Sequence, residues 1–399
     1  MKKTLLLMLL ATGACLQPVQ SQVVNRGAAI GIAEGGIFFV DGAFTNQSGS
    51  ILNDGRMIVK TSWQNNDSQL GVFNRASSGV VELSGADQSI GGSFKTEFPS
   101  LTISGSGIKT INIHTDVTGV LNLNDLELKT GEFTLSVQNS SPFAIVRGSG
   151  FVSTDSKGQL LRIINSVNTY LFPFGSADGG AVFYRPFEVE LKDAVQNSFS
   201  ASFSKKDPSS DGFSRQSKRP DIENVYDQYF YVLEQNGSSR VNIRFFQNSV
   251  QDAGVTQLVN YNRSGVWEKA GPSSVTTGSF GDGLNQHLLY SSTEVITNMP
   301  FTLATIKKDG PFTFFNAFTP DGDGINDKWE IKNLDLYPNN DLSVFNRWGD
   351  EVLKVKSYSS EKAWDGGNLN PGTYYYILNV EENGVKKAYK GFITMVKKD

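Results

Sequence analysis

The sequence predicts an all-β protein, and three observations support that fold class. Short apolar segments recur along the chain, and many alternate apolar with polar residues at the two-residue period of a half-buried strand. Glycine is abundant, with 40 among 399 residues, and turn-forming runs such as Asn53-Asp54-Gly55 separate the segments. Between residues 23 and 155, no window of about a dozen residues has the pattern of an amphipathic helix. The chain is long enough for two to four domains.

Charge and cysteine content limit the classes of partner and of stabilisation. The formal net charge is −4 and the chain has no basic block, so nothing predicts binding to nucleic acid or to anionic lipid. The only cysteine is Cys15, which excludes a disulfide framework. We therefore expect packed β-structure, rather than crosslinks, to stabilise the protein.

Residues 1–21 have the pattern of a signal peptide. Two lysines precede an apolar run over residues 5–14, and Val19-Gln20-Ser21 is a suitable cleavage site before Gln22. The apolar run is too short to cross a bilayer of about 30 Å. An alternative interpretation makes Cys15 the lipidated cysteine of a lipoprotein, although no aliphatic residue stands three positions before it. Both interpretations predict an exported protein.

Residues 22–155 form the first predicted β-region. Its apolar segments recur roughly every 8 to 12 residues, which is typical of short strands joined by tight turns. Stacked short strands would build a ladder-like core, so we expect a β-solenoid, with an elongated β-sandwich as the alternative. The repeat is too irregular for its period to be read from the sequence. The clearest segments are Gly36–Val40, Arg56–Lys60, Gly79–Leu83, Leu101–Ser104, Lys109–Ile113 and Glu132–Val137.

Two further regions follow the first. Residues 156–305 contain longer segments that are rich in aromatic residues, and this pattern favours a β-sandwich. Residues 306–311 have the composition of a linker. Residues 312–399 predict a compact β-sandwich of immunoglobulin-like size, in which Asn383-Gly384 is a strong signal for a hairpin between the last two strands.

The last region carries five ordered motifs. They are Asn316–Asp327 with Trp329, Val344–Gly349, Trp364–Gly366, Pro371–Tyr376 and Lys390–Thr394. In order and spacing this set resembles the gliding-motility-associated C-terminal domain, the type B sorting domain of type IX secretion cargo. The positions that carry the resemblance are Asn316, Pro320, Gly322, Gly324, Trp329, Arg347, Trp348, Gly349, Trp364, Asp365, Gly366, Gly372, Tyr374, Lys390, Gly391 and Phe392.

This resemblance has consequences for location and partners. It implies export across the inner membrane by the signal peptide, followed by recognition of the C-terminal domain by the type IX secretion translocon. An outer-membrane β-barrel protein is a further partner that the resemblance suggests. The protein would then lie on the outer face of the outer membrane or in the medium. The region before residue 312 is more loosely similar to repetitive β-helix surface proteins.

One loop of the last region is a candidate metal site. Asp321, Asp323, Asn326 and Asp327, with glycines between them, place oxygen ligands at spacings that suit Ca²⁺. The loop departs from an EF-hand because Lys332 stands at the twelfth position, where a bidentate glutamate belongs. Aspartate and asparagine also stabilise such turns without a metal. Both interpretations stay open.

The sequence predicts no catalytic residue and no enzyme. His114 and His287 lie in different predicted regions, and no serine has the surroundings of a nucleophile elbow. Glu188 and Glu190 share one face of a strand, but no aromatic-lined cleft accompanies them.

The tryptophans divide into two predicted groups. We expect Trp267, Trp329, Trp348 and Trp364 to fill cores, because each stands among apolar strand residues. Trp63 precedes a run of polar residues and is predicted to be an exposed contact residue.

Taken together, these features favour a structural or adhesin-like protein of the cell surface. The first alternative is a surface protein that binds polysaccharide, and the second is a secreted hydrolase.

Overall fold

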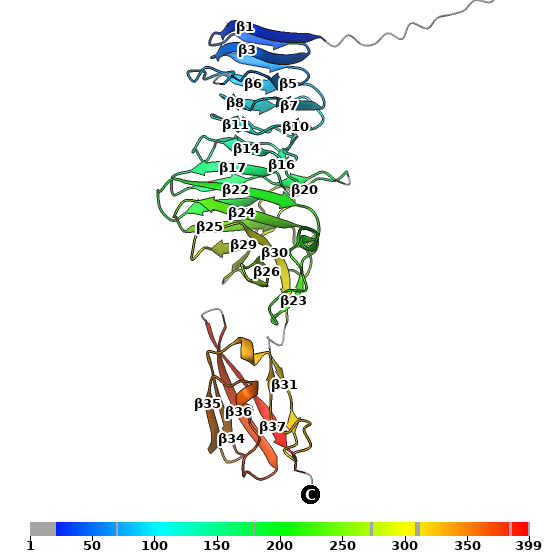
Figure 1. The fold of residues 1–399 in the computed structure, drawn as a ribbon, viewed down its shortest axis with the longest axis vertical. Helices are drawn as coiled ribbons and strands as arrows, with labels where there is room; N and C mark the ends of the chain where they lie inside the picture. The colour runs from blue at the N-terminus through cyan, green and yellow to red at the C-terminus, as the bar shows by residue number, and fades with distance from the viewer. Residues whose placement is uncertain are drawn as a thin grey trace, which may run out of the picture. The chain divides into compact units, whose positions relative to one another are not determined.

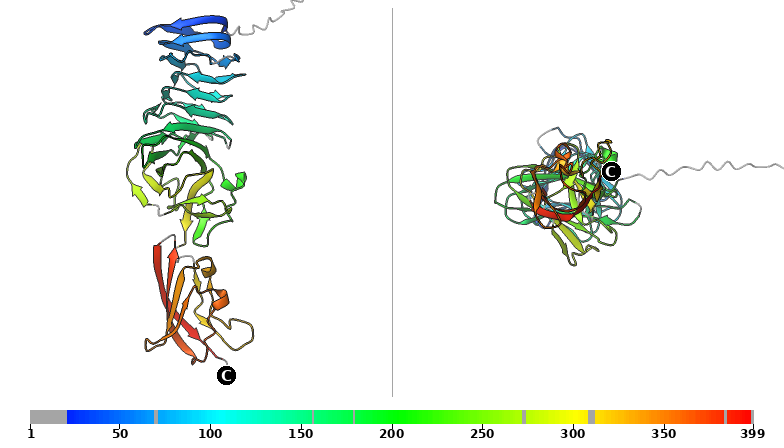
Figure 2. Two further views of the ribbon diagram at one scale, coloured as in Figure 1. Left: turned by 60° about the vertical axis from the view of Figure 1, so that its left-hand side comes forward. Right: turned by 90° about the horizontal axis from the view of Figure 1, so that it is seen from below.

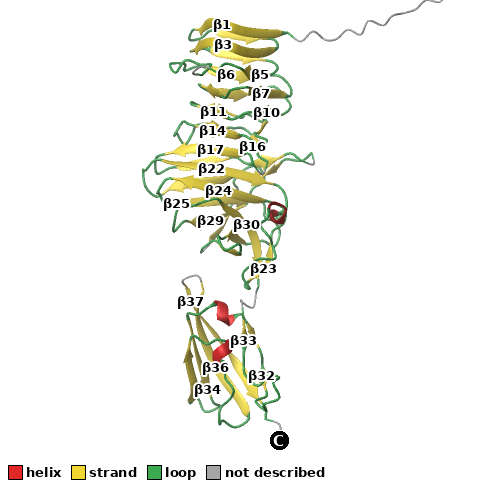
Figure 3. Cartoon of the chain, viewed as in Figure 1, coloured by secondary structure: helices red, strands yellow, loops and turns green. Residues whose placement is uncertain are grey.

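A computed structural model describes residues 21–68, 71–155, 157–178, 180–271, 274–307, 312–382 and 385–397. Within these ranges the secondary structure is almost entirely strand, with three short 3-10 helices and no α-helix (Figure 3). The all-β prediction is therefore confirmed. None of the helices in these ranges has the length and hydropathy needed to cross a membrane. The described residues fall into two compact units, one of 21–139 with 144–150, and one of 140–143 with 151–397.

The first unit is a β-solenoid. Its strands pair in parallel with strands one turn later, and the turns stack on one another in Figures 1 and 2. Parallel ladders of this kind select the solenoid over the alternative of an elongated sandwich. The first ladder is β1 (Gln22–Ile32), β3 (Ala43–Asn53), β5 (Trp63–Asn65), β7 (Gln88–Gly92), β10 (Lys109–Ile111) and β13 (Glu127–Lys129). The second is β2 (Ile37–Val40), β4 (Arg56–Val59), β6 (Val80–Leu83), β9 (Leu101–Ile103), β12 (Leu121–Asn122) and β15 (Ile145–Val146). The third contains β8 (Thr96–Phe98), β11 (Thr115–Val117) and β14 (Thr134–Val137).

The strand register gives the period that the sequence did not reveal. Gln88 pairs with Lys109, 21 positions later, and Lys109 pairs with Leu128, 19 positions later. The regular turn is interrupted where Trp63 pairs with Ile90, 27 positions later. Because this longer step carries an extra loop, the apolar segments do not recur at one fixed distance in the sequence.

Aromatic side chains fill the solenoid interior around Trp63. This residue is fully buried, and its ring stacks on Phe44 at 4.8 Å and on Phe73 at 5.5 Å between centroids. Its indole N–H donates to Thr96 Oγ1 over 2.9 Å. The prediction that Trp63 is an exposed contact residue is therefore wrong, because its ring points into the core and two of the polar residues that follow it, Asn65 and Asp67, are buried as well.

A lysine is also buried in the solenoid. The Lys109 ammonium donates to the carbonyl oxygens of Gly85 at 2.9 Å and Ser106 at 2.7 Å, and to that of Ala86. Burial lowers the pKa of Lys109 to about 8, a change opposed by the charge of Asp87. The side chain thus holds two successive turns together through backbone carbonyls rather than through an ion pair.

The part of the second unit up to residue 307 packs two antiparallel sheets face to face. Aromatic rings from the two sheets meet between them, for example Phe187 with Tyr231 at 5.7 Å and Phe245 with Phe301 at 5.5 Å between centroids. The first sheet contains β17 (Gln159–Ile164), β22 (Asn197–Ser204), β24 (Phe230–Asn236), β30 (Met299–Ile306), β26 (Gln257–Tyr261) and β27 (Trp267–Lys269), with β23 (Ile222–Val225) on β30. The second contains β18 (Thr169–Phe172), β21 (Phe187–Leu191), β25 (Val241–Gln247), β29 (Gln286–Ser291) and β28 (Ser274–Thr277). The remaining elements are β16 (Phe151–Ser153), β19 (Gly175–Ser176), β20 (Phe183–Tyr184) and the helix η1 (Pro208–Asp211).

The C-terminal domain begins at residue 312. Its last two strands form a long antiparallel hairpin, paired from Gly372 with Met395 to Glu382 with Val385, as the Asn-Gly signal predicts. The turn residues 383 and 384, most of the predicted linker and nearly all of the predicted signal peptide lie outside the described residues. The main sheet has the order β32 (Ala317–Phe318), β37 (Val385–Met395), β36 (Gly372–Glu382), β34 (Asn340–Phe345) and β35 (Glu351–Lys356). A second sheet pairs β31 (Thr313–Phe314) with β33 (Ile331–Lys332), and two helical turns are η2 (Leu334–Leu336) and η3 (Ser360–Lys362).

Candidate functional site

Two tryptophans of the C-terminal motifs join at the centre of that domain. Trp329 is fully buried and Trp364 is nearly so, and they form an antiparallel bridge in which Trp329 N donates to Trp364 O at 2.7 Å. The Tyr358 hydroxyl donates to Trp329 O and accepts from Trp364 N at 2.8 Å. Burial raises the pKa of the Tyr358 hydroxyl. These contacts confirm that both tryptophans are core residues.

Two motif glycines stand where no side chain fits. Gly366 has a φ of +80°, and a Cβ added there would overlap the sulfur of Met395. At Gly391, in β37, a Cβ would come within 2.5 Å of the Tyr376 hydroxyl. These two glycines therefore serve close packing of the domain.

Other motif residues hold the ends of strands. The carbonyl of Asn316 accepts from Thr394 N at 2.8 Å, and the Tyr374 hydroxyl donates to Asn370 O at 2.7 Å. The Asp365 carboxylate accepts from Gly367 N at 2.9 Å. Pro320 is half-buried, and Gly372 is exposed at the start of β36. Part of the motif set is therefore explained by contacts that stabilise the fold of the domain.

The Val344–Gly349 motif ends in an exposed turn. The Asn346 side chain accepts from Trp348 N at 2.9 Å and from Asp350 N at 3.0 Å, and Gly349 has a φ of +89°. Trp348 is 76% exposed, so the prediction that it fills a core is wrong. The turn directs its side chain away from the domain, and the Arg347 guanidinium lies 4.9 Å from its ring centroid.

The acidic loop between β32 and β33 brings three carboxylates together. Oxygens of Asp321, Asp323 and Asp327 lie within 4.8 Å of one another, and the loop is largely exposed. The Asp327 carboxylate accepts from Gly322 N at 2.6 Å and from Gly324 N at 2.8 Å.

Further backbone contacts stabilise the same loop. Asp323 Oδ1 accepts from Ile325 N at 2.8 Å, and the carbonyl of Asn326, at φ +54°, accepts from Thr319 N at 2.9 Å. The oxygens suit a hard cation such as Ca²⁺, and the backbone bonds also account for the loop without one.

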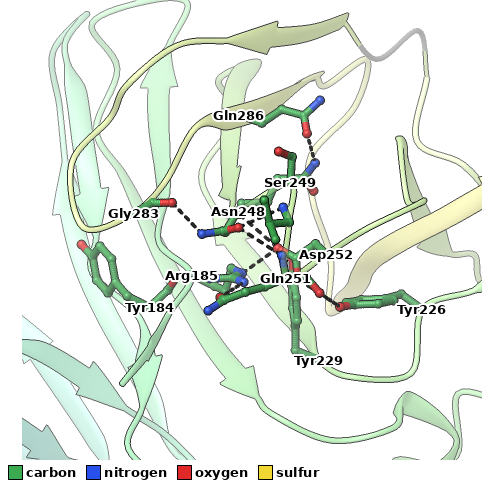
Figure 4. Close-up of polar contacts among 12 residues, drawn as sticks. Tyr184, Arg185, Tyr226, Tyr229, Asn248, Ser249, Gln251, Asp252, Gly283 and Gln286 are labelled. Carbon is green, nitrogen blue, oxygen red and sulfur yellow. Dashed lines mark hydrogen bonds and ion pairs between the residues drawn. The ribbon is translucent and has the colours of Figure 1, made fainter. Parts of the chain in front are cut away.

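A buried polar cluster lies between the sheets of the middle region and the loop after β25 (Figure 4). Arg185 Nε donates to Asp252 Oδ2 at 2.8 Å, and Arg185 Nη2 donates to Gln251 Oε1 at 2.8 Å. The Tyr226 hydroxyl donates to the other oxygen of Asp252 at 3.0 Å. Burial, followed by the Asp252 charge, raises the pKa of Tyr226. The cluster satisfies its own charges and fastens the 248–252 loop.

Of the groups considered for catalysis, Glu188, Glu190 and His114 have polar partners, and His287 has aromatic ring contacts. Glu188 and Glu190 both face Arg244, at 3.6 and 3.1 Å, and burial raises the pKa of Glu188. His114 Nδ1 accepts from the Thr134 amide at 3.1 Å. His287 lies in β29 beside aromatic rings, and burial lowers its pKa.

The exposed aromatic side chains of the C-terminal sheet were not predicted from the sequence. Tyr374, Tyr375 and Tyr376 are consecutive in β36, and alternate side chains of a strand point to opposite faces. Tyr374 and Tyr376 are buried, so Tyr375 stands on the open face. The run of three tyrosines was the signal that could have revealed this surface.

The fold and these sites define a multidomain β-protein with a solenoid followed by a sandwich and a separately cored C-terminal domain. Residues 312–395 match the family model of the CHU_C type IX secretion signal domain. The chain is therefore a cargo of the type IX secretion machinery, exported to the cell surface or the extracellular space. Neither the curated proteins nor the solved structures contain a match to the chain.

Proposed function

We propose that the protein acts at the cell surface as a structural or adhesive protein whose solenoid makes contacts outside the cell. The observation that carries this proposal is an apolar surface on the first turns of the solenoid. Ile37 and Phe39 of β2 are 66% and 56% exposed, and Leu52 of β3 is also exposed. Ile37 and Phe39 lie on the same face of β2, and exposed apolar patches on a protein commonly mark a contact surface.

The edge of the solenoid adds to this surface. Among the described residues, β1 pairs only with β3 and β2 only with β4, so each leaves one edge open. Open edges with nearby apolar side chains favour pairing with a further strand. The first turns thus combine backbone donors and acceptors with apolar side chains.

The test compares cells that display the parent chain with cells that display the Ile37→Ser/Phe39→Ser variant. We expect the variant to reach the surface in equal amount and to lose most cell–cell or cell–surface attachment. Val167→Ser, at a position 57% exposed in the middle region, is the matched control and should attach normally. Unchanged attachment of the double variant would contradict the proposal.

A second candidate function is polysaccharide binding, favoured by a groove of about 600 Å³ on the solenoid. Short polar side chains dominate its lining, and they supply the donors and acceptors that sugar hydroxyls use. The lining includes Ser62, Ser89, Thr110, Asn112, Asp87 and Lys129.

Affinity electrophoresis of the purified full chain in polysaccharide gels tests the second candidate. Retardation that Thr110→Ala/Asn112→Ala abolishes, and that Ile37→Ser/Phe39→Ser does not, would select polysaccharide binding. Migration unaffected by every polysaccharide tested would reject it.

A further inference from the structure

A row of aromatic side chains crosses the open face of the C-terminal sheet. In the strand register Phe345 of β34 stands opposite Tyr375 of β36, and Tyr375 stands opposite Phe392 of β37. Tyr375 and Phe392 are 51% and 53% exposed, and Phe345 is half-buried. Opposite side chains on adjacent strands have Cβ atoms about 5 Å apart, so the three form one continuous band.

The Trp348 turn follows directly from the end of this row. Phe345 is the last residue of β34, and the Asn346 side chain bonds that fix the turn begin at the next position. The turn thus presents the most exposed tryptophan side chain of the described chain from a defined backbone. Because the backbone is already ordered, a partner would lose little conformational entropy in binding it.

The composition of this surface is that of a binding hot spot. Tryptophan, tyrosine and arginine are the residues whose removal most often abolishes protein association. Here Trp348, Tyr375 and Arg347 occur together outside the core, although each exposed ring costs solvation free energy. The fold does not need them there, because Trp329, Trp364 and their neighbours already fill the core.

Charges of both signs border the band, and two of the cations have no ion-pair partner. Glu351 stands opposite Phe345 at the end of the row, and Asp350, in the Trp348 turn, accepts from the Asn346 side chain at 2.9 Å. In the part of the chain that the structure describes, Lys354 pairs with Glu351 and Lys387 with Glu382, whereas Arg347 and Lys390 form no ion pair. Lys390 stands opposite Ile377, one row along the same face. A complementary partner therefore offers an apolar groove with carboxylates at its rim.

We propose that Phe345, Tyr375, Phe392 and the Arg347–Trp348 turn form a docking face for an acidic-rimmed apolar groove on a protein of the type IX secretion machinery. This inference rests on the role of residues 312–395 as a secretion signal. It separates the motif residues into two sets. The first set stabilises the fold of the domain. The second set forms the docking face, to which the machinery binds.

The experiment uses the full chain in its native host, with surface and periplasmic amounts measured by fractionation and surface labelling. The variants are Trp348→Ser and Tyr375→Ser/Phe392→Ser. Each is expected to lower the surface amount by about tenfold or more, with accumulation in the periplasm, as loss of a hot spot implies. Leu336→Ser, at an exposed apolar position of the same domain outside the five motifs, is the matched control and should be exported like the parent.

A charge variant keeps the test independent of folding. Arg347→Glu/Lys390→Glu removes no buried contact, so its thermal unfolding should match that of the parent while its export falls. Export of all three variants at the parent level would overturn the inference. Normal export with a loss of retention on polysaccharide would also overturn it, because the face would then bind a carbohydrate.

Deletion of residues 312–399 distinguishes this inference from the assignment on which it rests. If the deletion blocks export and the docking-face variants do not, the domain is the signal but the machinery reads another face. If the deletion leaves export unchanged, the secretion assignment itself fails.

Discussion

The solenoid and the C-terminal domain are both made of strands, yet they are stabilised in different ways. In the solenoid, each short parallel strand contacts only the turns before and after it, for example β7 with β5 and β10. In the C-terminal domain, residues distant in sequence close one shared core around Trp329, Trp364 and Tyr376. Stability should therefore be local and additive in the first region and cooperative in the second.

This difference also separates folding from recognition. The solenoid repeats its contacts, so a lost side chain affects a few turns and leaves the rest of the surface intact. The C-terminal domain has one core, so the same kind of loss removes the whole domain, including any surface that the secretion machinery reads. The comparison can be tested by substitutions of similar size in the two regions.

The largest effect is expected from Trp329→Ala. Truncation of a fully buried tryptophan costs about 3–5 kcal/mol, comparable with the whole stability of a small domain. Hydrogen exchange measured by peptide should show loss of protection throughout residues 312–397. Exchange confined to the peptide around residue 329 would contradict the cooperative description.

Trp63→Ala is the matched change in the solenoid. The same few kcal/mol should be lost, because this ring is also fully buried and stacks on Phe44 and Phe73. Here the faster exchange should stay within the turns that contact Trp63, and residues 115–137 should keep their protection. Uniform loss of protection along the solenoid would show that it unfolds as one unit.

A pH effect of intermediate size should come from Lys109. Because burial lowers its folded pKa to about 8 from the ordinary value of 10.5, the unfolded chain binds more protons between these pH values. Its contribution to the free energy of unfolding should thus rise with pH across that window, by at most about 1 kcal/mol per pH unit. In thermal unfolding, the advantage of the parent over Lys109→Met should grow from pH 8 to pH 10. A constant difference would mean that Lys109 is not desolvated.

The smallest effect is expected in the acidic loop. Asp327→Ala removes the acceptor for two backbone amides in an exposed loop, at a cost of about 1 kcal/mol. If these bonds alone hold the loop, calcium leaves the melting temperature of the C-terminal domain unchanged. A calcium-dependent increase that Asp321→Asn abolishes would instead establish the cation site.

Sequence patterns predicted the class of each region better than the direction of single side chains. Alternation and turn signals located most strands, and the Asn-Gly pair predicted the hairpin of β36 and β37. The solenoid period was hidden because the step from Trp63 to Ile90 is longer than its neighbours. Alternation is a pattern over many residues, so one irregular step does not hide the fold class. The repeat length depends on equal steps, so the same irregularity prevents it from being found.

The two tryptophans whose exposure was wrongly predicted show why site residues are harder to predict than fold class. Trp63 is followed by polar residues but points inward, whereas Trp348 is flanked by apolar strands but sits on a turn fixed by Asn346. Local composition cannot supply this direction, because it depends on strand register and turn geometry. The Arg185–Asp252 pair is likewise invisible in sequence, since 67 positions separate its members.

The solenoid's register also determines how the region can change in length. Each regular turn consumes about 19 to 21 residues and advances the stack by one strand spacing, about 4.8 Å. A tandem duplication of one turn would therefore lengthen the region by a single fixed increment and leave the outward residues of every other turn in place. Any other insertion has to leave the stack as a loop. The length of the solenoid can therefore change only by whole turns, and a duplication of about twenty codons adds one turn.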